Sequence, residues 1–282
     1  RGIRIEGTGL WLDATERKPF SYVSHAHMDH SVPHAKVLAS KKTSRLYSHR
    51  CKSGEVIEVD YNEPFSINGV SITLFPAGHI LGSSQILIET DLRWVYTGDF
   101  RMVRGETAEA IEVKPCDILV MESTFGRYHY VFPKKDKVID ELLHFVESAR
   151  TAGRTPVIYA YSMGKSQEVI KVLGDLGYHL SVHQRIYEIA KIYEELGVLL
   201  QGYEPFNGQK TRGKVVVMPP YAVRQSVTRE LGRRATCILT GWALEPGAEE
   251  SWGVDKAIPL SDHADFVELL AYVLLAKPKK IY

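Results

Sequence analysis

The stretch SHAHMDH, residues 24–30, places three histidines and an aspartate close together along the chain. It continues a run of aromatic and β-branched residues, FSYV, which predicts a strand that leads directly into it. Because side chains alternate along a strand, His25 and His27 are expected on the same side of the chain. Asp29 and His30 follow after a turn and would open a second group of ligands beside the first. Imidazole and carboxylate groups at this density favour a pocket for two divalent metal ions over the alternative, a histidine-rich surface loop.

Two later segments each present one more ligand-type side chain where a strand is expected to end. His79 lies in PAGHILGSSQ, residues 76–85, between a strand and a glycine-bounded turn. Asp99 ends the strand of VYTGDFR, residues 95–101. Loops at strand ends often build binding sites, so the two residues strengthen the metal-site interpretation, although either one alone would favour a structural role. His34 has no place in this pattern and is expected at the surface.

The composition is that of an ordinary globular protein, with 282 residues, 44% of them hydrophobic and 24% charged, and a net charge of +1. The longest apolar runs are too short to span a membrane and no signal pattern opens the chain, so we expect a soluble, cytoplasmic protein without a membrane partner. The three cysteines are an odd number, lie far apart and form no C-x-x-C pair, so neither a disulfide framework nor a zinc–thiolate site is implied by Cys51, Cys116 and Cys237. A metal ion would therefore be held by histidine and carboxylate. The net charge alone does not indicate a nucleic-acid partner.

The first part of the chain is typical of short strands, and the second part of alternating strands and helices. An Asn-Gly pair at 68–69 predicts a hairpin. Beyond residue 134, apolar residues at three-to-four spacing predict helices, whose alternation with strands indicates a parallel α/β arrangement. Strands are expected at 20–25, 56–61, 70–77, 84–90, 93–100, 117–123, 155–161, 214–220, 236–241 and 254–261. Helices are expected at 137–153, 164–177, 185–197, 221–232 and 264–275, and a loop at 242–253.

The order H-x-H-x-D-H, lone histidine and strand-terminal aspartate resembles the signature of the metallo-β-lactamase fold. An earlier strand-end aspartate supports the ligands in that superfamily, and Asp13 in LWLDA matches it, with a simple turn residue as the alternative. The resemblance implies two zinc ions, although manganese fits the same ligands. It implies that His25, His27 and His79 hold one ion, that Asp29 and His30 hold the other, and that Asp99 bridges them.

Two later motifs, KPCDILVMESTFG at 114–126 and IPLSDHADF at 258–266, resemble those of the β-CASP nucleases. This metallo-β-lactamase group carries an inserted α/β domain and acts on nucleic acids. The acidic motif falls on Glu122 and the histidine motif on His263. The resemblance implies that His263 protonates the leaving oxygen while Glu122 steers it, and that Asp29 orients the attacking hydroxide.

The resemblance covers nearly the whole chain and implies an α/β fold, a metallo-β-lactamase αββα sandwich with an inserted α/β β-CASP domain. The sandwich would occupy residues 1–125 and a return segment at 251–282, with the insert at 126–250. In this group a last metal-ligand motif lies in the strand after the D-H-A-D helix, and the chain has only begun that strand at its last residue. We therefore expect that the return segment is truncated and that the natural protein continues beyond Tyr282.

The segment YAYSMGKSQEVI, residues 159–170, resembles the helix start that faces phosphate in β-CASP inserts. Gly164 and the amino terminus of the helix would offer N–H groups, and Lys165 would add positive charge. We therefore predict that Ser162, Gly164 and Lys165 bind a substrate phosphate. An ordinary turn into an amphipathic helix is the alternative.

The pattern as a whole is most similar to small prokaryotic exonucleases of the ligase-associated type, whose relatives often carry 3′-end-processing-factor names. This resemblance implies a metal-dependent nuclease, favours DNA slightly over RNA, and suggests DNA repair beside a DNA ligase or helicase. Glu122 instead favours the RNA-processing members. Two hypotheses from other classes stay open. One is a thioester or lactone hydrolase of the same fold, against which the insert at 126–250 argues, and the other is a nucleic-acid-binding scaffold with an inactive metal site.

Overall fold

The chain forms two compact units, which we call unit 1 and unit 2. The computed structural model describes residues 2–52, 54–208, 211, 213–224 and 231–282. Unit 1 contains Arg1–His129 and His263–Tyr282, and unit 2 contains Tyr130–Asp262. Unit 2 is therefore inserted in sequence between the two segments of unit 1. Among the residues described, no helix combines the length and the hydropathy that a membrane span requires.

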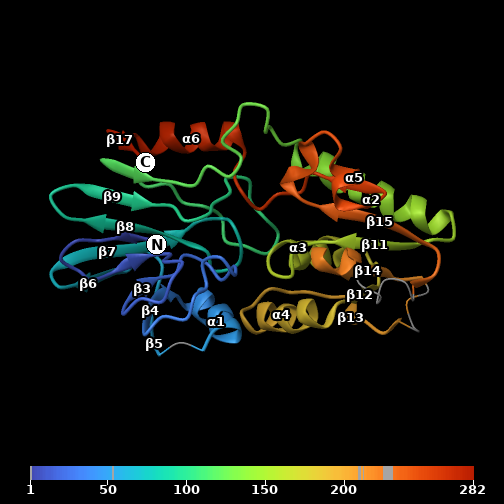
Figure 1. Ribbon diagram of the computed structural model, residues 1–282, viewed down its shortest axis with the longest axis horizontal. Coiled ribbons are helices and arrows are strands. Elements are labelled where there is room, and N and C mark those ends of the chain that lie inside the picture. The colour runs from blue at the N-terminus through green and yellow to red at the C-terminus, as the bar shows by residue number, and fades with distance from the viewer. Residues whose placement is uncertain (1, 53, 209–210, 212, 225–230) are drawn as a thin grey trace. The chain divides into compact units, whose positions relative to one another are not determined.

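Two sheets form the centre of unit 1 (Figure 1). The first contains five strands in the order β1-β2-β3-β4-β5, which are parallel except for the antiparallel pair β1 and β2. These strands are β1 (Ile3–Arg4), β2 (Trp11–Leu12), β3 (Ser21–Tyr22), β4 (Lys36–Ser40) and β5 (Glu55–Val59). The strand expected at 20–25 is thus confined to the two residues of β3.

The second sheet of unit 1 contains six strands in the order β17-β10-β9-β8-β7-β6. Its strands are β6 (Pro64–Ile67), β7 (Val70–Pro76), β8 (Ser84–Glu89), β9 (Arg93–Tyr96), β10 (Ile118–Val120) and β17 (Lys280–Ile281). The predicted hairpin is confirmed, since Ile67 pairs with Val70 and both Asn68 and Gly69 have positive φ. Such angles are typical of the two-residue turns whose twist matches that of the strands they join.

Unit 1 is a four-layer α-β-β-α sandwich, as the family resemblance implied. Apolar side chains of the two sheets, among them Leu38 and Ile86, fill the space between the sheets. Helix α6 (Phe266–Ala276) covers the second sheet through side chains such as Tyr272, and helix α1 (Lys41–Arg50) contacts β4 and β5. Figure 1 shows the two helices on opposite sides of the paired sheets. The layers bring the strand ends of both sheets to the same region of unit 1, where the functional side chains lie.

Helix α1 was not predicted from the sequence. Its first five residues, KKTSR at 41–45, have the composition of a basic surface cluster. The helix begins at Ser40, whose hydroxyl accepts a hydrogen bond from the Thr43 N–H at 3.1 Å. Its buried face includes Thr43 and Ser44 beside Leu46 and Tyr47. Because two of these four side chains are polar, apolar periodicity gives little sign of the helix.

Truncation of Leu38 tests the position of the core. We expect Leu38→Ala to lower the free energy of unfolding by about 2–5 kcal/mol, because the side chain is fully buried between the sheets. Leu274→Ala is the control, since Leu274 is 75% exposed on α6 and its truncation should change the free energy by less than about 0.5 kcal/mol. Urea unfolding followed by circular dichroism measures both. Equal losses in the two variants would contradict a core between the sheets.

Unit 2 is built on six parallel strands in the order β13-β12-β14-β11-β15-β16. All four residues of the central strand β14 are buried, so both faces of the sheet are covered. The parallel α/β arrangement predicted for this half is confirmed. The strands are β11 (Thr155–Tyr159), β12 (Leu180–Val182), β13 (Tyr203–Pro205), β14 (Val215–Met218), β15 (Arg234–Leu239) and β16 (Lys256–Ile258). The helices are α2 (Lys135–Thr151), α3 (Lys165–Asp175), α4 (Gln184–Glu195), α5 (Ala248–Trp252) and the 3-10 helices η2 (Pro220–Arg224) and η4 (Gly241–Leu244).

Three details of unit 2 differ from the expectation. The segment at 242–253 was expected to be a loop but contains most of η4 and all of α5. Glycines with positive φ lie at both ends of the short helix α5. Of the helix expected at 221–232, the part at 225–230 lies outside the described residues. Unit 2 extends to Asp262 rather than to residue 250, because β16 pairs with β15 and so belongs to the inserted sheet.

Candidate metal centre

Six ligand-type side chains of unit 1 lie just beyond strand ends or just before a helix. They are His25 and His27 after β3, His79 after β7, Asp99 after β9, Glu122 after β10 and His263 before α6. Because a sheet holds its strand ends in fixed positions, the loops that follow can bring together residues that are far apart in sequence. The structure does bring these predicted residues together.

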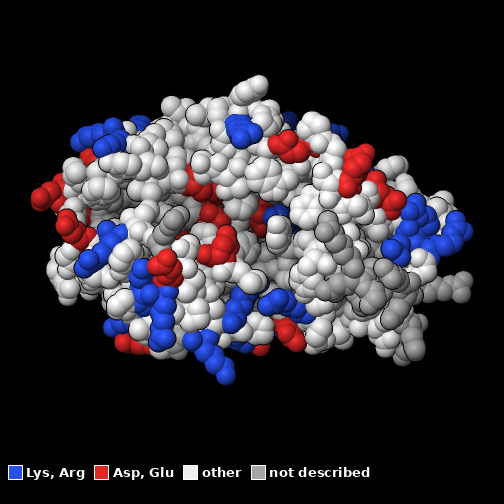
Figure 2. All heavy atoms as spheres, viewed as in Figure 1, with Lys and Arg blue, Asp and Glu red and all other residues white. Residues whose placement is uncertain are grey.

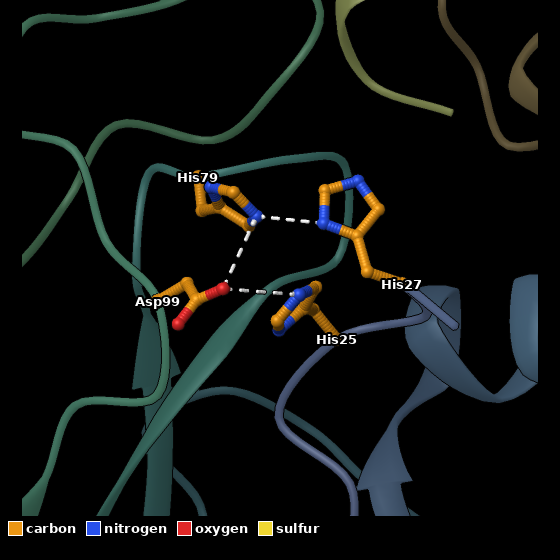
Figure 3. A group of neighbouring side chains, drawn as sticks. All are labelled: His25, His27, His79 and Asp99. Atoms are coloured by element: carbon orange, nitrogen blue, oxygen red, sulfur yellow. Dashed lines mark hydrogen bonds and ion pairs between the residues drawn. The ribbon is translucent and has the colours of Figure 1, made fainter. Parts of the chain in front are cut away.

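The four side chains drawn in Figure 3 converge on one point. The Oδ2 atom of Asp99 lies 3.5 Å from Nε2 of His25 and 3.9 Å from Nε2 of His79. Nδ1 of His27 lies 3.0 Å from Nε2 of His79. Atoms that bind one zinc ion at about 2.1 Å lie about 3–4 Å from each other. Only a small adjustment would therefore bring these four residues onto a single ion.

His25 provides a test of whether these residues fit a metal ion. Its ring is fully buried, and its Nε2 atom has no hydrogen-bond partner among the described residues. A buried polar atom without a partner costs about 1–3 kcal/mol, which a cation bound at Nε2 would offset. Three imidazoles and one carboxylate form a nitrogen-rich donor set that suits zinc and also accepts manganese or iron. The residues present therefore fit a divalent metal ion.

His30 lies beside this group of four. Its Nε2 atom is 3.5 Å from Oδ2 of Asp99 and 3.7 Å from Oδ2 of Asp29. The Asp29 side chain is 79% exposed, whereas that of His30 is largely buried. Asp99 is therefore close to both predicted groups of ligands, and Asp29 lies at the solvent-facing end of the second group.

Asp13 holds several groups of this region in place. Its Oδ2 atom lies 2.9 Å from Nδ1 of His30 and accepts a hydrogen bond from the Tyr96 hydroxyl at 2.8 Å. The backbone N–H and the hydroxyl of Ser24 donate to its two carboxylate oxygens at 2.8 and 2.6 Å. These contacts are those that the predicted supporting role of Asp13 requires. The sequence analysis did not identify Ser24 or Tyr96, whose only signal is their closeness in sequence to ligand residues.

A glycine is required immediately before Asp99. Gly98 has a φ of 54°, in the left-handed region that favours glycine, and a Cβ atom there would lie 2.6 Å from the Ser24 side chain. A larger residue would displace either the Asp99 loop or the hydrogen bonds that Ser24 donates to Asp13. The Gly-Asp pair at the end of β9 thus allows the carboxylate to approach the histidines.

Burial and neighbouring charges set the protonation of the site before any cation binds. Burial, followed by the surrounding histidines, holds the pKa of His25 well below its ordinary value, so the ring is neutral and can act as a ligand. Burial raises the pKa of Asp99 to about 7. Burial alone would lower the pKa of His30, but Asp13 and Asp99 outweigh it and raise that pKa to about 10. A divalent cation would stabilise the ionised form of Asp99 and compete with the proton on His30.

His263 and Glu122 form a pair next to Asp99. Nδ1 of His263 lies 3.0 Å from Oε2 of Glu122 and 4.0 Å from Oδ2 of Asp99. The other oxygen of Glu122 accepts a hydrogen bond from the Phe100 N–H at 2.7 Å, which fixes the carboxylate. The ring of His263 lies 4.6 Å from that of His79, centroid to centroid. The two predicted catalytic residues therefore contact each other beside the candidate ligands.

The three residues predicted to bind phosphate lie in unit 2, between β11 and the first turn of α3. The Gly164 N–H donates to the Gln167 side chain at 2.8 Å, and the Ser162 carbonyl accepts from the same side chain at 3.1 Å. Lys165 is 6% exposed, and its ammonium group forms an ion pair with Asp262. The Gly164 N–H and the Lys165 ammonium group thus have partners within unit 2, and the assignment of the three residues to a substrate phosphate stays a prediction.

The expectation that His34 lies at the surface is wrong. Its residue is only 1% exposed, and its Nδ1 atom accepts a hydrogen bond from the Lys18 N–H at 3.1 Å. The backbone N–H of His34 is 3.4 Å from the Tyr47 hydroxyl of α1. His34 therefore joins the segment after the ligand-rich stretch to neighbouring parts of unit 1.

One known protein aligns with nearly the whole chain. No protein-family model matches the sequence. A protein from Opitutus terrae described as "Probable DNA ligase" is 35% identical over 284 residues, which cover 99% of this chain and 28% of the relative. "Endoribonuclease YSH1" from Eremothecium gossypii is 32% identical over 121 residues, 42% of this chain and 15% of that protein. "RNase aCSPSF2" from Saccharolobus solfataricus is 28% identical over 162 residues, 53% of this chain and 32% of that protein.

The chain thus spans less than a third of the length of each of these relatives. Among solved structures, a protein of unknown function from Enterococcus faecalis has the same fold, with a TM-score of 0.63 and 15% sequence identity. That match covers 93% of this chain and 74% of the other. In its sequence and in its sandwich with an inserted parallel sheet, the chain therefore resembles the β-CASP nuclease group of the metallo-β-lactamase fold and is similar to its ligase-associated members.

Proposed function

We propose that this chain is a metal-dependent nuclease that hydrolyses phosphodiester bonds in nucleic acid, as an exonuclease that acts on DNA in repair. The observation that carries the proposal is the position of Asp99 Oδ2, which lies between 3.5 and 4.0 Å from nitrogen atoms of four histidines. Three of these belong to the metal-ligand pattern, and the fourth, His263, is the predicted general acid. Metal ligands and a general acid around one carboxylate suit the hydrolysis of a phosphodiester, in which water displaces the leaving oxygen at phosphorus.

Two metal ions are assigned to this site, with zinc favoured by the nitrogen-rich donor set and manganese as the alternative. His25, His27 and His79 would hold one ion, Asp29 and His30 the other, and Asp99 would contact both. When bound, such ions supply polarisation of the phosphate oxygens and a bound water with a pKa near neutrality. Asp13 would not bind the ion itself, but its contact with Nδ1 of His30 keeps the imidazole ring oriented.

His263 and Glu122 have the geometry to supply the proton for the leaving group. The contact between Oε2 of Glu122 and Nδ1 of His263 orients the ring, so that Nε2 delivers a proton to the oxygen that leaves phosphorus. The Phe100 N–H restrains the other oxygen of Glu122 and so keeps this arrangement in place. The carboxylate of Asp29 is exposed and lies near His30. In this position it can accept a hydrogen bond from the attacking water and so orient it.

DNA is favoured as the substrate because the relative that aligns with 99% of the chain is described as a probable DNA ligase. The same relative supports a DNA ligase, alone or with a helicase, as the functional partner. Relatives described as an endoribonuclease and an RNase support the second candidate, an RNA-processing nuclease, which Glu122 also favours. A thioester or lactone hydrolase is disfavoured because it would need neither unit 2 nor the motif around His263.

Digestion of end-labelled single-stranded DNA and RNA of one sequence, with the 5′ and 3′ ends blocked in turn, tests the proposal. We expect DNA to shorten from one end in the presence of zinc or manganese. EDTA should reduce the rate to background, because metal removal takes away the polarising charge and the activated water together. Faster digestion of RNA would favour the second candidate. Binding without cleavage of either strand by the metal-loaded protein would refute the nuclease and indicate an inactive scaffold.

A further inference from the structure

Three aromatic side chains are exposed at one edge of the unit 2 sheet. Tyr161 follows β11, Tyr221 follows β14 and Trp242 follows β15, and these strands are neighbours in the order β14-β11-β15. The exposed fractions of the three residues are 47%, 49% and 40%. Parallel strands end at the same edge, and neighbouring strands lie about 4.8 Å apart, so the three segments leave the sheet within about 10 Å of one another.

A switch point of a parallel sheet lies between two neighbouring strands whose onward connections run in opposite directions. The strand order gives the described sheet of unit 2 two such points, and the aromatic residues lie at them. The connection from β11 leads to β12, and the connection from β15 leads the opposite way to β16. The connections from β12 to β13 and from β14 to β15 diverge in the same manner. Open parallel sheets bind ligands at the carboxyl ends of strands whose connections diverge. Tyr161 and Trp242 follow the strands of the first switch point, and His183 and Tyr221 follow those of the second.

Each ring is braced by a neighbour within unit 2. The Lys165 ammonium group lies 5.1 Å from the ring centroid of Tyr161. Tyr130 meets Trp242 edge-on, with the centroids 5.5 Å apart and the planes at 89°. His183 meets the ring of Tyr221 edge-on, with the centroids 6.0 Å apart and the planes at 89°. Rings that are already oriented lose little conformational entropy when a flat ligand stacks on them.

Two groups at this edge that could bind a phosphate already have partners within unit 2. Lys165 is paired with Asp262, and the Gly164 N–H is bonded to Gln167. The net charge of the whole chain is only +1. On the face shown in Figure 2, the described lysines and arginines are interspersed with aspartates and glutamates. Exposed aromatic faces at this edge can bind a ligand without the help of charge, and bases stack on such faces without regard to sequence.

We propose that Tyr161, Tyr221 and Trp242 form a stacking platform for unpaired nucleobases, so that the substrate is single-stranded nucleic acid. This inference rests on the proposed nuclease function and adds the form of its substrate. Bases within a duplex are stacked on each other and cannot reach the platform. Stacking does not read the 2′-hydroxyl, so the platform binds single-stranded DNA and RNA alike.

Binding of a fluorescein-labelled oligothymidylate to the full chain, measured by fluorescence anisotropy in EDTA to prevent cleavage, tests the platform. Each of the variants Tyr161→Leu, Tyr221→Leu and Trp242→Leu should bind about 5- to 100-fold more weakly. Phenylalanine at the same positions keeps a ring and should keep affinity within about threefold of the wild type. Tyr178→Leu is the matched control, because Tyr178 precedes β12 at the opposite edge of the same sheet and should not affect binding.

An abasic oligonucleotide of the same length separates stacking from attraction to the backbone. The wild-type protein should bind it about as weakly as the leucine variants bind oligothymidylate. Equal affinity of the wild type for the two ligands would overturn the proposal. Leucine variants that unfold at a lower temperature but bind oligothymidylate like the wild type would also overturn it, because the rings would then serve packing alone.

Activity measurements distinguish the failure of the platform from the failure of the nuclease. In an active enzyme the leucine variants should raise KM for single strands and leave kcat unchanged. Cleavage with unchanged KM and Kd in all three variants would exclude the platform and leave the nuclease standing. Ring-dependent binding by a metal-loaded protein that does not cleave would support the platform and refute the nuclease.

Discussion

Replacement of Asp99 by asparagine is expected to lower kcat/KM for phosphodiester cleavage by at least about a thousandfold. Oδ2 of Asp99 lies within 4.0 Å of ring nitrogens from both predicted ligand groups, including those of His25 and His30. The asparagine side chain has the same shape but carries no negative charge to balance a cation. We therefore expect Asp99→Asn to bind less than half of the wild-type metal content, as measured by inductively coupled plasma mass spectrometry.

The same substitution is expected to lower stability only when metal is bound. In the metal-free protein, burial raises the pKa of Asp99 to about 7, so the ionised carboxylate is unfavourable and a neutral amide should be neutral or stabilising. With zinc present, the wild type gains the free energy of metal binding, which grows with the ratio of metal concentration to Kd. In differential scanning fluorimetry, Asp99→Asn should therefore melt at or above the temperature of the wild type in EDTA and below it in zinc.

Asp91→Asn is the control for this pair of measurements. Asp91 lies in the exposed turn between β8 and β9, so its substitution removes the same charge from the same sheet without contact to the histidines. It should retain wild-type activity, metal content and melting temperature. Wild-type turnover together with wild-type metal content in Asp99→Asn would show that this carboxylate is not the centre of the site.

The ligand residues could be predicted because chemistry restricts which side chains can bind a metal. His79 and Asp99 were recognisable from residue type and order, and the structure places both beside the histidine-rich stretch. Ser24 and Tyr96 could not be predicted, because their role depends on hydrogen bonds to Asp13 from different parts of the fold. Hydroxyl groups of this kind occur throughout the sequence, and only the packing of the two sheets decides which of them matter.

Predictions of secondary structure succeeded where the local pattern was strong. The helix expected at 137–153 is confirmed as α2, whose buried residues recur every three to four positions. Helix α1 was missed because three of its four buried side chains carry a hydroxyl group and only Leu46 is aliphatic. His34 was expected at the surface because it has no place in the ligand pattern. It is instead buried, because an internal hydrogen bond replaces its contact with water.

Replacement of His263 by alanine is expected to lower kcat for a nucleic-acid substrate by about 10²- to 10⁴-fold while the metal content stays at the wild-type value. The imidazole lies 3.0 Å from Glu122 and 4.0 Å from Asp99, so it is placed to transfer a proton beside the ligands. Glu122→Gln should cause a smaller loss, because the ring is retained but less firmly oriented. His144→Ala, which removes an exposed histidine from α2, is the control and should leave kcat unchanged.

The leaving group separates proton transfer from metal binding as the cause of this loss. A nitrophenyl phosphodiester releases an anion that is stable without protonation, so His263→Ala should cleave it at nearly the wild-type rate. An alkyl leaving group, such as the deoxyribose oxygen, needs the proton and should show the full loss. Asp99, Glu122 and His263 also lie close enough together to hold an ion. A lower metal content in His263→Ala, with equal losses on both substrates, would therefore assign His263 to metal binding and contradict its role as the acid.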